Sequence, residues 1–355
     1  MSFTVQRGED FHTSNQLILL RDDGGRLEAT VAPASGGEVS SLKWKGQELL
    51  YRANQFDSPP AGGWRGRAPL LWPAVGRNFG PRRHQEVVAG GADPSEGSFL
   101  YKRKEWPIRI HGFASRQAWQ LVDAGVAADA SDFAFVRLRL DSDAKTREMY
   151  PFDFHLEVEH RLTAETLLST YRLTALTDGL FASFGNHITL VLPGGPDAFD
   201  ATRVRLSAAD PCLLELVPPG LTTGRVAAMR SDLADGTAQL GDSALLDAVT
   251  AGFTAAPARL ELRHPLLPPL VVSQWGSHLV LPPANPGDEP VKLPLNAQHF
   301  HFVLWGNREL QFFCPEPWYG LPNSLNTREG VVILGAGETA EWVMEVRITE
   351  SPESP

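Results

Sequence analysis

The chain has 355 residues, of which 43% are hydrophobic, and its 32 basic and 42 acidic side chains leave a formal net charge of -10. This acidic balance argues against a nucleic-acid partner, which needs a basic stripe. No apolar run approaches the ~18 residues that cross a membrane, and the amino terminus lacks the basic and apolar regions of a signal peptide. Two cysteines form no disulfide framework, so we expect a cytoplasmic protein without a membrane partner.

Short segments of alternating apolar residues, separated by Gly and Pro, follow one another along the chain. Early strands are expected over residues 17–20, 26–31 and 39–44. The clearest strand covers residues 152–162, where large apolar side chains occupy one face and charged side chains the other. No segment has a long 3.6-residue period, and the best helical candidate is residues 243–251. The pattern predicts an all-β sandwich or barrel with few short helices.

The remaining segments are expected to be loops. Residues 81–98 are polar and Gly-rich and are predicted to form a mobile surface loop, and residues 282–294 a Pro-rich loop. Residues 197–256 have the least regular pattern and are interpreted as a strand-loop-strand excursion. Because no linker or repeat divides the chain, we expect one domain over residues 1–348 and a disordered polar tail over 349–355.

The segment FFCPEPWYG, residues 312–320, places a single carboxylate, Glu316, between two prolines and beside aromatic rings. Proline fixes φ and removes a donor, so Glu316 is predicted to lie on a stiff turn just after an apolar strand. Rings beside a carboxylate exclude water and raise its proton affinity, which suits a general base. The alternative is a solvated glutamate on a strand-end turn.

Histidines and an arginine at the ends of predicted strands are further candidates. His111 and His187 each lie beside a strand end, where a histidine is either catalytic or a half-buried structural residue. His299 and His301 alternate on a strand, but no nearby carboxylate or cysteine completes a ligand set, so we expect no metal. Arg77 is either a fork that donates to hydroxyls or an anion, or one half of a surface salt bridge.

The order of these segments resembles the aldose 1-epimerase (galactose mutarotase-like) family, and most closely its LacX-like bacterial members. The resemblance covers about residues 17–348. The matching segments are APLLWPAVGR (68–77), HGFA (111–114) with Trp119, YPFDF (150–154), SFGNH (183–187), EPWYG (316–320) and SLN (324–326).

The resemblance implies a large antiparallel β-supersandwich with a sugar cleft across one sheet and no metal or organic cofactor. It implies that Glu316 is the base at the anomeric hydroxyl and His187 the acid toward the ring oxygen. His111 and Arg77 match residues that hold and polarise the sugar, and Asn78 and Trp318 are assigned to substrate binding with them. Acid and base must reach O1 and O5 of one sugar, so we expect Glu316 and His187 on facing sides of a cleft, about a sugar ring apart.

The sequence departs from the family at two points. The residues after His187 are ITLVLP, where aromatic residues or proline are expected near the histidine. The family's further carboxylate, which binds sugar hydroxyls, has no clear match; Asp242 and Asp247 are the candidates.

Two alternatives to a mutarotase of free hexoses stay open. The segment WRGRAP (64–69) resembles the entry of the hexose-6-phosphate 1-epimerases, so Arg65 or Arg67 is either a phosphate ligand or a surface charge. The other alternative is a non-catalytic carbohydrate-binding protein of the same fold. A glycoside hydrolase is disfavoured, because it needs two carboxylates flanking one bond and only Glu316 is placed. The sugar is not identified, and the protein is expected to be a monomer or homodimer.

Overall fold

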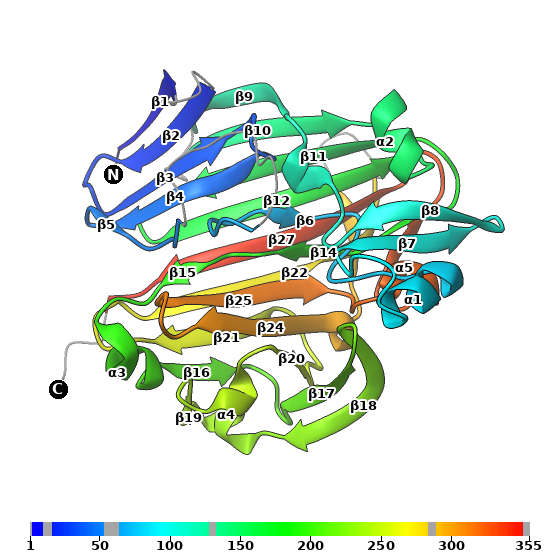
Figure 1. Ribbon diagram of the computed structural model, residues 1–355. Helices are drawn as coiled ribbons and strands as arrows, with labels where there is room; N and C mark the ends of the chain where they lie inside the picture. The colour runs from blue at the N-terminus through cyan, green and yellow to red at the C-terminus, as the bar shows by residue number, and fades with distance from the viewer. Residues whose placement is uncertain (1, 10–15, 53–63, 128–132, 283–288, 351–355) are drawn as a thin grey trace.

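The computed structural model describes residues 2–9, 16–52, 64–127, 133–282 and 289–350 (Figure 1). Strands dominate these residues, and every pairing between named strands is antiparallel apart from isolated bridges. The described α-helices are short: α1 (Pro81–Val88), α2 (Ala144–Met149), α3 (Gly195–Asp200), α4 (Ser231–Asp235) and α5 (Ser324–Thr327). The predicted antiparallel all-β class with few short helices is therefore confirmed.

Two large sheets form most of the fold. In spatial order the ten-stranded sheet contains β19 (Ala238–Gln239), β16 (Arg203–Leu206), β21 (Ala258–Arg263), β22 (Leu270–Leu281), β27 (Thr339–Ile348), β12 (Thr166–Ala175), β11 (Phe154–Leu162), β10 (Ala134–Asp141) and β9 (Gln120–Val126), with β23 (Val291–Pro294) paired to β22. The eight-stranded sheet contains β18 (Leu221–Met229), β17 (Cys212–Val217), β20 (Ala248–Ala251), β24 (Phe300–Asn307), β25 (Phe312–Tyr319), β14 (Phe184–Asn186) and β6 (Leu70–Leu71), with β15 (Leu190–Val191) on β25.

Three smaller sheets complete the described structure. The first is a five-stranded sheet with the order β1 (Phe3–Glu9), β2 (Gln16–Asp22), β3 (Leu27–Ala32), β4 (Glu38–Trp44) and β5 (Gln47–Glu48). The other two are strand pairs, β7 (Glu96–Tyr101) with β8 (Lys104–Arg109) and β13 (Leu180–Ala182) with β26 (Val332–Leu334). The β7–β8 hairpin, α1 and α5 gather at one end of the large sheets (Figure 1).

The core lies between the sheets and is built by strict alternation along the strands. The apolar side chains of β11 are buried and its charged side chains are not, as the pattern of residues 152–162 predicted. Aromatic rings join the sheets: Trp72 packs on Phe154 of β11 at 4.6 Å, and Phe184 of β14 stacks on Trp342 of β27 at 6.1 Å. The prediction of a single domain over residues 1–348 remains a prediction.

Several predicted loops are regular structure. Residues 81–98 contain α1 and the start of β7. The helix α1 begins at Pro81, after Gly80, because proline at a first helical position has the φ that the helix needs. Residues 243–251 form a single 3₁₀ turn and then β20 rather than a helix. Residues 291–294 are β23, paired with β22, although the sequence was expected to form a loop there.

The segment 197–256 is richer than a strand-loop-strand excursion. It contributes β16 and β19 to the edge of the ten-stranded sheet, and β17, β18 and β20 to the edge of the eight-stranded sheet. In the predicted tail, the Thr349 N–H donates to the Pro269 carbonyl at 3.0 Å and Glu350 pairs with Lys45 at 3.0 Å. Residues 351–355 lie outside the described residues. No helix within the described ranges is long and apolar enough to cross a membrane.

Candidate active site

A cavity of about 650 Å³ opens on the face of the eight-stranded sheet that points away from the core. Leu71, Val249 and Val303, from β6, β20 and β24, form an apolar floor. Loops after β6 and β8, and the end of β17, supply the walls. Concave, largely apolar sites of ~300–1,000 Å³ with a few converging polar groups are typical of small-molecule binding.

Glu316 lies in the middle of strand β25 and not, as predicted, on a turn that follows an apolar strand. One neighbour of β25 is β24, which pairs with its full length. On its other side β14 pairs only with Trp318 and Tyr319, and β15 only with Phe312 and Phe313. Residues 314–317 thus have a strand partner on one side only, and prolines that lack an N–H are tolerated at such interruptions. The alternation of β25 then directs Glu316 and Trp318 into the cavity.

Glu316 is 2% exposed. Its Oε2 accepts a hydrogen bond from Trp318 Nε1 at 3.2 Å, and its Oε1 lies 3.4 Å from His187 Nε2. Burial raises the pKa of Glu316 well above its usual 4.5, while the Trp318 N–H acts in the opposite direction. The aromatic residues beside Glu316 in the sequence predicted this rise.

His187 follows β14 and meets Glu316 across neighbouring strands. Burial lowers the pKa of His187 to about 4, so its imidazole is neutral near pH 7. Its Nδ1 is buried and has no hydrogen-bond partner among the described residues. Because the two groups are in contact, they titrate as one pair rather than as independent residues. The expected separation of a sugar ring is wrong for this state of the protein: the two groups share one cavity but are in direct contact.

His111 is tied to the neighbouring loop by two hydrogen bonds. The backbone N–H of His111 donates to the Gly76 carbonyl at 3.0 Å, and the backbone N–H of Gly76 donates to the ring nitrogen His111 Nδ1 at 3.2 Å. Because Nδ1 accepts, the proton of the neutral ring is on Nε2, which becomes a donor. Burial, followed by His187, Arg116 and Arg77, lowers the pKa of His111 well below 6.5.

The three groups were also considered as metal ligands. One ligand atom from each of His111, His187 and Glu316 lies within 4.8 Å of the others. A metal on His111 Nε2 needs that nitrogen deprotonated, which would put the proton on Nδ1 and break the bond from Gly76. The arrangement is better suited to hydrogen bonding and proton transfer, and the absence of a metal stays a prediction.

Arg77 and Asn78 are adjacent in the sequence, but only Arg77 lines the cavity. Arg77 lines the cavity, and its guanidinium has no hydrogen bond or ion pair with any described residue. Asn78 is buried and is not among the residues that line the cavity, which disfavours its assignment to substrate binding. Its amide donates to the Val75 carbonyl at 3.3 Å and accepts from the Leu325 N–H at 2.9 Å, and both ends are therefore used to hold loops together.

Arg65 and Arg67 both line the cavity but in different ways. Arg67 is 3% exposed and its Nη1 donates to Glu38 Oε1 at 2.5 Å. Burial raises the pKa of Glu38 to about 7 even though Arg67 opposes the shift. Arg67 is thus occupied by a buried carboxylate of β4, which corrects its interpretation as a surface charge and disfavours it as a phosphate ligand. Arg65 is half-buried.

Of Asp242 and Asp247, the two candidates for the carboxylate that binds sugar hydroxyls, only one lines the cavity. Asp247 lines the cavity and is exposed. Asp242 accepts from the Ala244 N–H and pairs with Arg230 at 2.9 Å, outside the cavity lining. Only Asp247 is placed to meet a ligand in the cavity.

Aromatic residues that the sequence analysis did not assign to the site form one wall. Trp64 and Trp305 lie edge to face at 4.8 Å, and both approach His187, at 6.0 Å and 5.4 Å between ring centroids. Trp64 Nε1 is buried without a hydrogen-bond partner among the described residues. Alternation along β24 places Trp305 on the same face as Val303, a signal that was present in the sequence. Rings of this kind pack against the C–H faces of a sugar.

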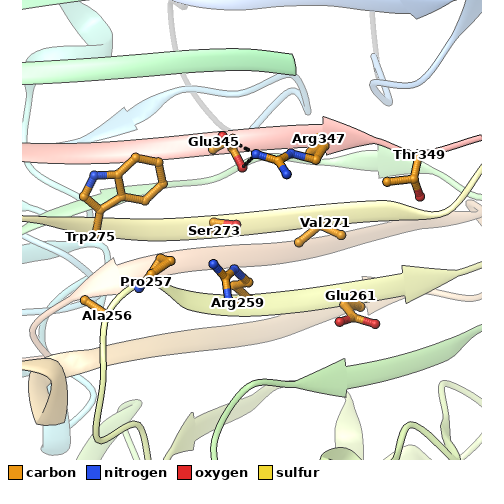
Figure 2. A pocket seen from close by; sticks show the side chains of 10 residues that line it. All are labelled: Ala256, Pro257, Arg259, Glu261, Val271, Ser273, Trp275, Glu345, Arg347 and Thr349. Atoms are coloured by element: carbon orange, nitrogen blue, oxygen red, sulfur yellow. Dashed lines mark hydrogen bonds and ion pairs between the residues drawn. The ribbon is translucent and has the colours of Figure 1, made fainter. Parts of the chain in front are cut away.

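A second hollow of about 550 Å³ lies on the outer face of the ten-stranded sheet, across β21, β22 and β27 (Figure 2). Its side chains point away from the core, and an ion pair at 3.2 Å joins Glu345 to Arg347. It contains no histidine and no buried acid–base pair, so it is not the candidate active site.

Comparisons with known proteins bear on the family resemblance and on the fold. The sequence model of the aldose 1-epimerase family matches residues 95–266. Solved structures with similar folds include a galactose mutarotase-like protein of Clostridium acetobutylicum (17% identity, TM-score 0.72, 99% of each chain) and galactose 1-epimerase of Lactobacillus acidophilus (14% identity, TM-score 0.65, 99% of this chain and 100% of that one). A protein of Synechocystis is 23% identical with a TM-score of 0.67 over 98% of this chain and 99% of its own.

None of the curated proteins compared matches the chain. The predicted resemblance to the aldose 1-epimerase family and the predicted galactose mutarotase-like fold are confirmed. The finer resemblance to LacX-like members remains a prediction.

Proposed function

We propose that this chain, whose residues 95–266 match the aldose 1-epimerase family, is itself an aldose 1-epimerase that interconverts the α and β anomers of an aldose. The observation that carries the proposal is the contact between Glu316 and His187 at 3.4 Å, in a cavity of about 650 Å³ that has room for a sugar. Burial raises the pKa of Glu316 and lowers that of His187, and in the proposed mechanism the pair holds one proton. General acid–base catalysis needs such a pair.

The reaction uses this proton twice. Glu316 removes the proton from the O1 hydroxyl while His187 donates a proton to the ring oxygen O5, and the C1–O5 bond breaks to leave an aldehyde at C1. Rotation about C1–C2 presents the other face of the aldehyde. The ring closes as O5 attacks C1, its proton returns to His187, and Glu316 returns a proton to O1. Each positioned proton transfer contributes on the order of 10²–10⁴ in rate.

Burial favours the proton on Glu316 over His187, so binding of the sugar must shift it to His187. Hydrogen bonds donated to a carboxylate favour its ionised form. The Trp318 N–H already donates to Glu316, and the sugar's O1 hydroxyl supplies another donor. In the proposed reaction the sugar lies between Glu316 and His187 and so separates them.

Other groups are proposed to hold the substrate. His111 presents an Nε2–H donor, and Arg77 has a guanidinium without a partner among the described residues. Asp247 is available to accept from hydroxyls, and Trp64 and Trp305 supply apolar faces. No organic cofactor or metal enters the proposed reaction, and we keep the predictions of a cytoplasmic monomer or homodimer.

A non-catalytic carbohydrate-binding protein remains the alternative, since the ITLVLP segment after His187 departs from the family. The test is exchange between anomers, measured by two-dimensional NMR or polarimetry on a panel of free and phosphorylated aldoses. The proposal expects exchange above the spontaneous rate, lost in Glu316→Gln. Sugar binding without any accelerated exchange would favour the binding protein.

A further inference from the structure

The outer hollow of about 550 Å³ is built by three neighbouring strands of the ten-stranded sheet, β21, β22 and β27 (Figure 2). Its floor consists of Val271, Ser273 and Trp275, alternate residues of β22 whose side chains leave the same face of the sheet. Strands lie about 4.8 Å apart, so the side chains of β21 and β27 form two walls with backbones about 10 Å apart. A volume of this size suits a small molecule.

Two rows of opposite charge cross the hollow. In the first row Ser273 pairs in register with Arg259 of β21 on one side and with Glu345 of β27 on the other. In the second row the order of the charges is reversed, with Glu261 on β21 and Arg347 on β27. Two arginines and two glutamates cancel, so the hollow has no field that would concentrate ions of one sign.

These charged groups retain unused hydrogen-bonding capacity. Within β27, Glu345 pairs with Arg347 at 3.2 Å, and Glu261 pairs with Arg205 of β16 at 3.6 Å. Arg259 forms no ion pair with any described residue. Guanidinium groups only donate and carboxylates only accept, and each has more positions than one ion pair uses. The walls therefore offer donors and acceptors together.

The floor carries a buried hydroxyl group that lacks a partner. Ser273 is 1% exposed, and its Oγ forms no hydrogen bond with any described residue. Buried polar groups are nearly always hydrogen-bonded, and one that is left unpaired costs free energy. Because Ser273 lies at the base of the hollow, between the two charged walls, a polar group of a bound ligand is placed to pair with it.

Trp275 adds an aromatic face to this polar surface. Its side chain is half-buried, and no other described ring packs against it. Figure 2 shows the indole at one end of the hollow and Thr349 at the other. An aromatic face next to groups that donate and accept hydrogen bonds matches a ligand with one apolar C–H face and a rim of hydroxyls.

We propose that this hollow is a second carbohydrate site that binds a neutral sugar, with a ring face on Trp275 and hydroxyls on Ser273 and the charged walls. Charges that cancel give no advantage to an anionic ligand, whereas each hydroxyl both donates and accepts. The core separates the hollow from the cavity on the eight-stranded sheet, so a sugar bound here does not reach Glu316. The hollow retains carbohydrate without transforming it, and the inference does not depend on the proposed function.

The test records the indole N–H signals of isotope-labelled tryptophans by NMR while a sugar is added. The Trp275→Phe variant identifies the signal from the hollow, and Trp64, Trp305 and Trp318 report on the cavity. Methyl glucoside, methyl galactoside and methyl maltoside are the probes, because the methyl group on O1 locks the ring and prevents turnover. At least one of them should shift the Trp275 signal to saturation, and the midpoint gives the dissociation constant of the hollow.

Variants of the hollow separate binding there from binding in the cavity. Ser273→Ala removes the buried hydroxyl and should raise the dissociation constant read from Trp275 roughly threefold to tenfold. Arg259→Gln removes donors of a charged group and should raise it at least as much. Arg263→Gln is the matched control, because Arg263 lies on the same face of β21 but outside the hollow, and it should leave the constant unchanged. All of these variants should anomerise glucose at the wild-type rate.

Several results would overturn the inference. One is a Trp275 signal that none of the sugars shifts, and another is a shift whose midpoint Ser273→Ala and Arg259→Gln leave unchanged. Tighter binding of glucuronate than of methyl glucoside would contradict a neutral ligand. A Trp275 signal that responds to protein concentration instead of sugar would assign the hollow to a second copy of the chain. Normal anomer exchange with a silent Trp275 signal leaves only the proposed function, and sugar binding in the hollow without exchange leaves only the second site.

Discussion

Glu316 and His187 come from neighbouring strands, and 3.4 Å separates the Glu316 Oε1 from the His187 Nε2. In the antiparallel register of β14 against β25, Gly185 pairs with Trp318. His187, two residues after Gly185, therefore lies beside Glu316, two residues before Trp318, over the same cavity. Trp318 donates to Glu316 from two positions along the same strand. The pair and its orienting donor are thus carried by one sheet, and sites on regular elements are positioned more accurately than sites on loops.

The first prediction concerns Glu316→Gln. Glutamine keeps the shape and still accepts from Trp318 Nε1, but it cannot take up the O1 proton. We expect kcat for anomer exchange to fall at least ~10² while KM changes little, because the lost interaction is used mainly in the transition state. Glu345→Gln, on the outer face of the ten-stranded sheet, is the control and should keep wild-type rates. A Glu316→Gln protein with normal kcat would remove Glu316 from the mechanism.

The second prediction concerns His187→Asn, alone and combined with Glu316→Gln. Because the two groups pass one proton between them, the double variant should be barely slower than either single variant. His264→Asn replaces another buried histidine, one that lies outside the cavity lining, and controls for loss of packing. Rate losses that multiply in the double variant would show that Glu316 and His187 act independently.

The alternation of apolar and polar residues predicted the fold class well, because each strand carries this pattern in its own sequence. The alternation over residues 152–162 appears as β11, with its apolar face in the core. The course of β25 was not predicted, because Pro315 and Pro317 are signals for a turn when read locally. Pairing with the whole of β24, from a different part of the chain, overrides that signal.

The site was predicted in part, and through the family resemblance more than through single residues. Glu316, His187, His111 and Arg77 are indeed brought into one cavity. Arg67 and Asn78 were assigned from their place in a segment, but partners remote in the sequence decide their roles: Glu38 of β4 for Arg67 and Leu325 of α5 for Asn78. No pattern near either residue reveals these partners.

The third prediction concerns the pH dependence of catalysis. The pair needs one proton, carried by His187 while Glu316 is ionised, so activity should fall as pH rises through the raised pKa at which the pair loses that proton. Trp318→Phe keeps an aromatic ring but removes the donor that lowers this pKa. The falling limb of the kcat profile should therefore move to higher pH by roughly one to two units, the equivalent of a hydrogen bond to a charged group. An unshifted limb would show that the Trp318 N–H does not act on the ionisation of Glu316.

The last prediction connects the same carboxyl group to stability. A folded-state pKa raised above the unfolded value means that folding favours the protonated acid. Glu316 therefore contributes stability that is fully present below its unfolded pKa, near 4.5, and is lost as pH rises through the raised folded pKa. Glutamine at this position stays neutral at every pH, so the Glu316→Gln protein should escape that loss.

Urea unfolding at several pH values from 4.5 to 9 measures this effect directly. The free energy of unfolding of Glu316→Gln minus that of wild type should rise with pH, by about 1.36 kcal/mol for each pH unit between the unfolded and the folded pKa of Glu316. His187→Asn should show the opposite trend. Since burial lowers the pKa of His187 from 6.5 to about 4, its contribution is present above pH 6.5 and is lost as pH falls through about 4. Other titrating groups are common to the variants and wild type and largely cancel in each difference. A Glu316→Gln difference that stays flat across this range would show that the Glu316 carboxyl is already ionised at low pH and is not held protonated by the cavity.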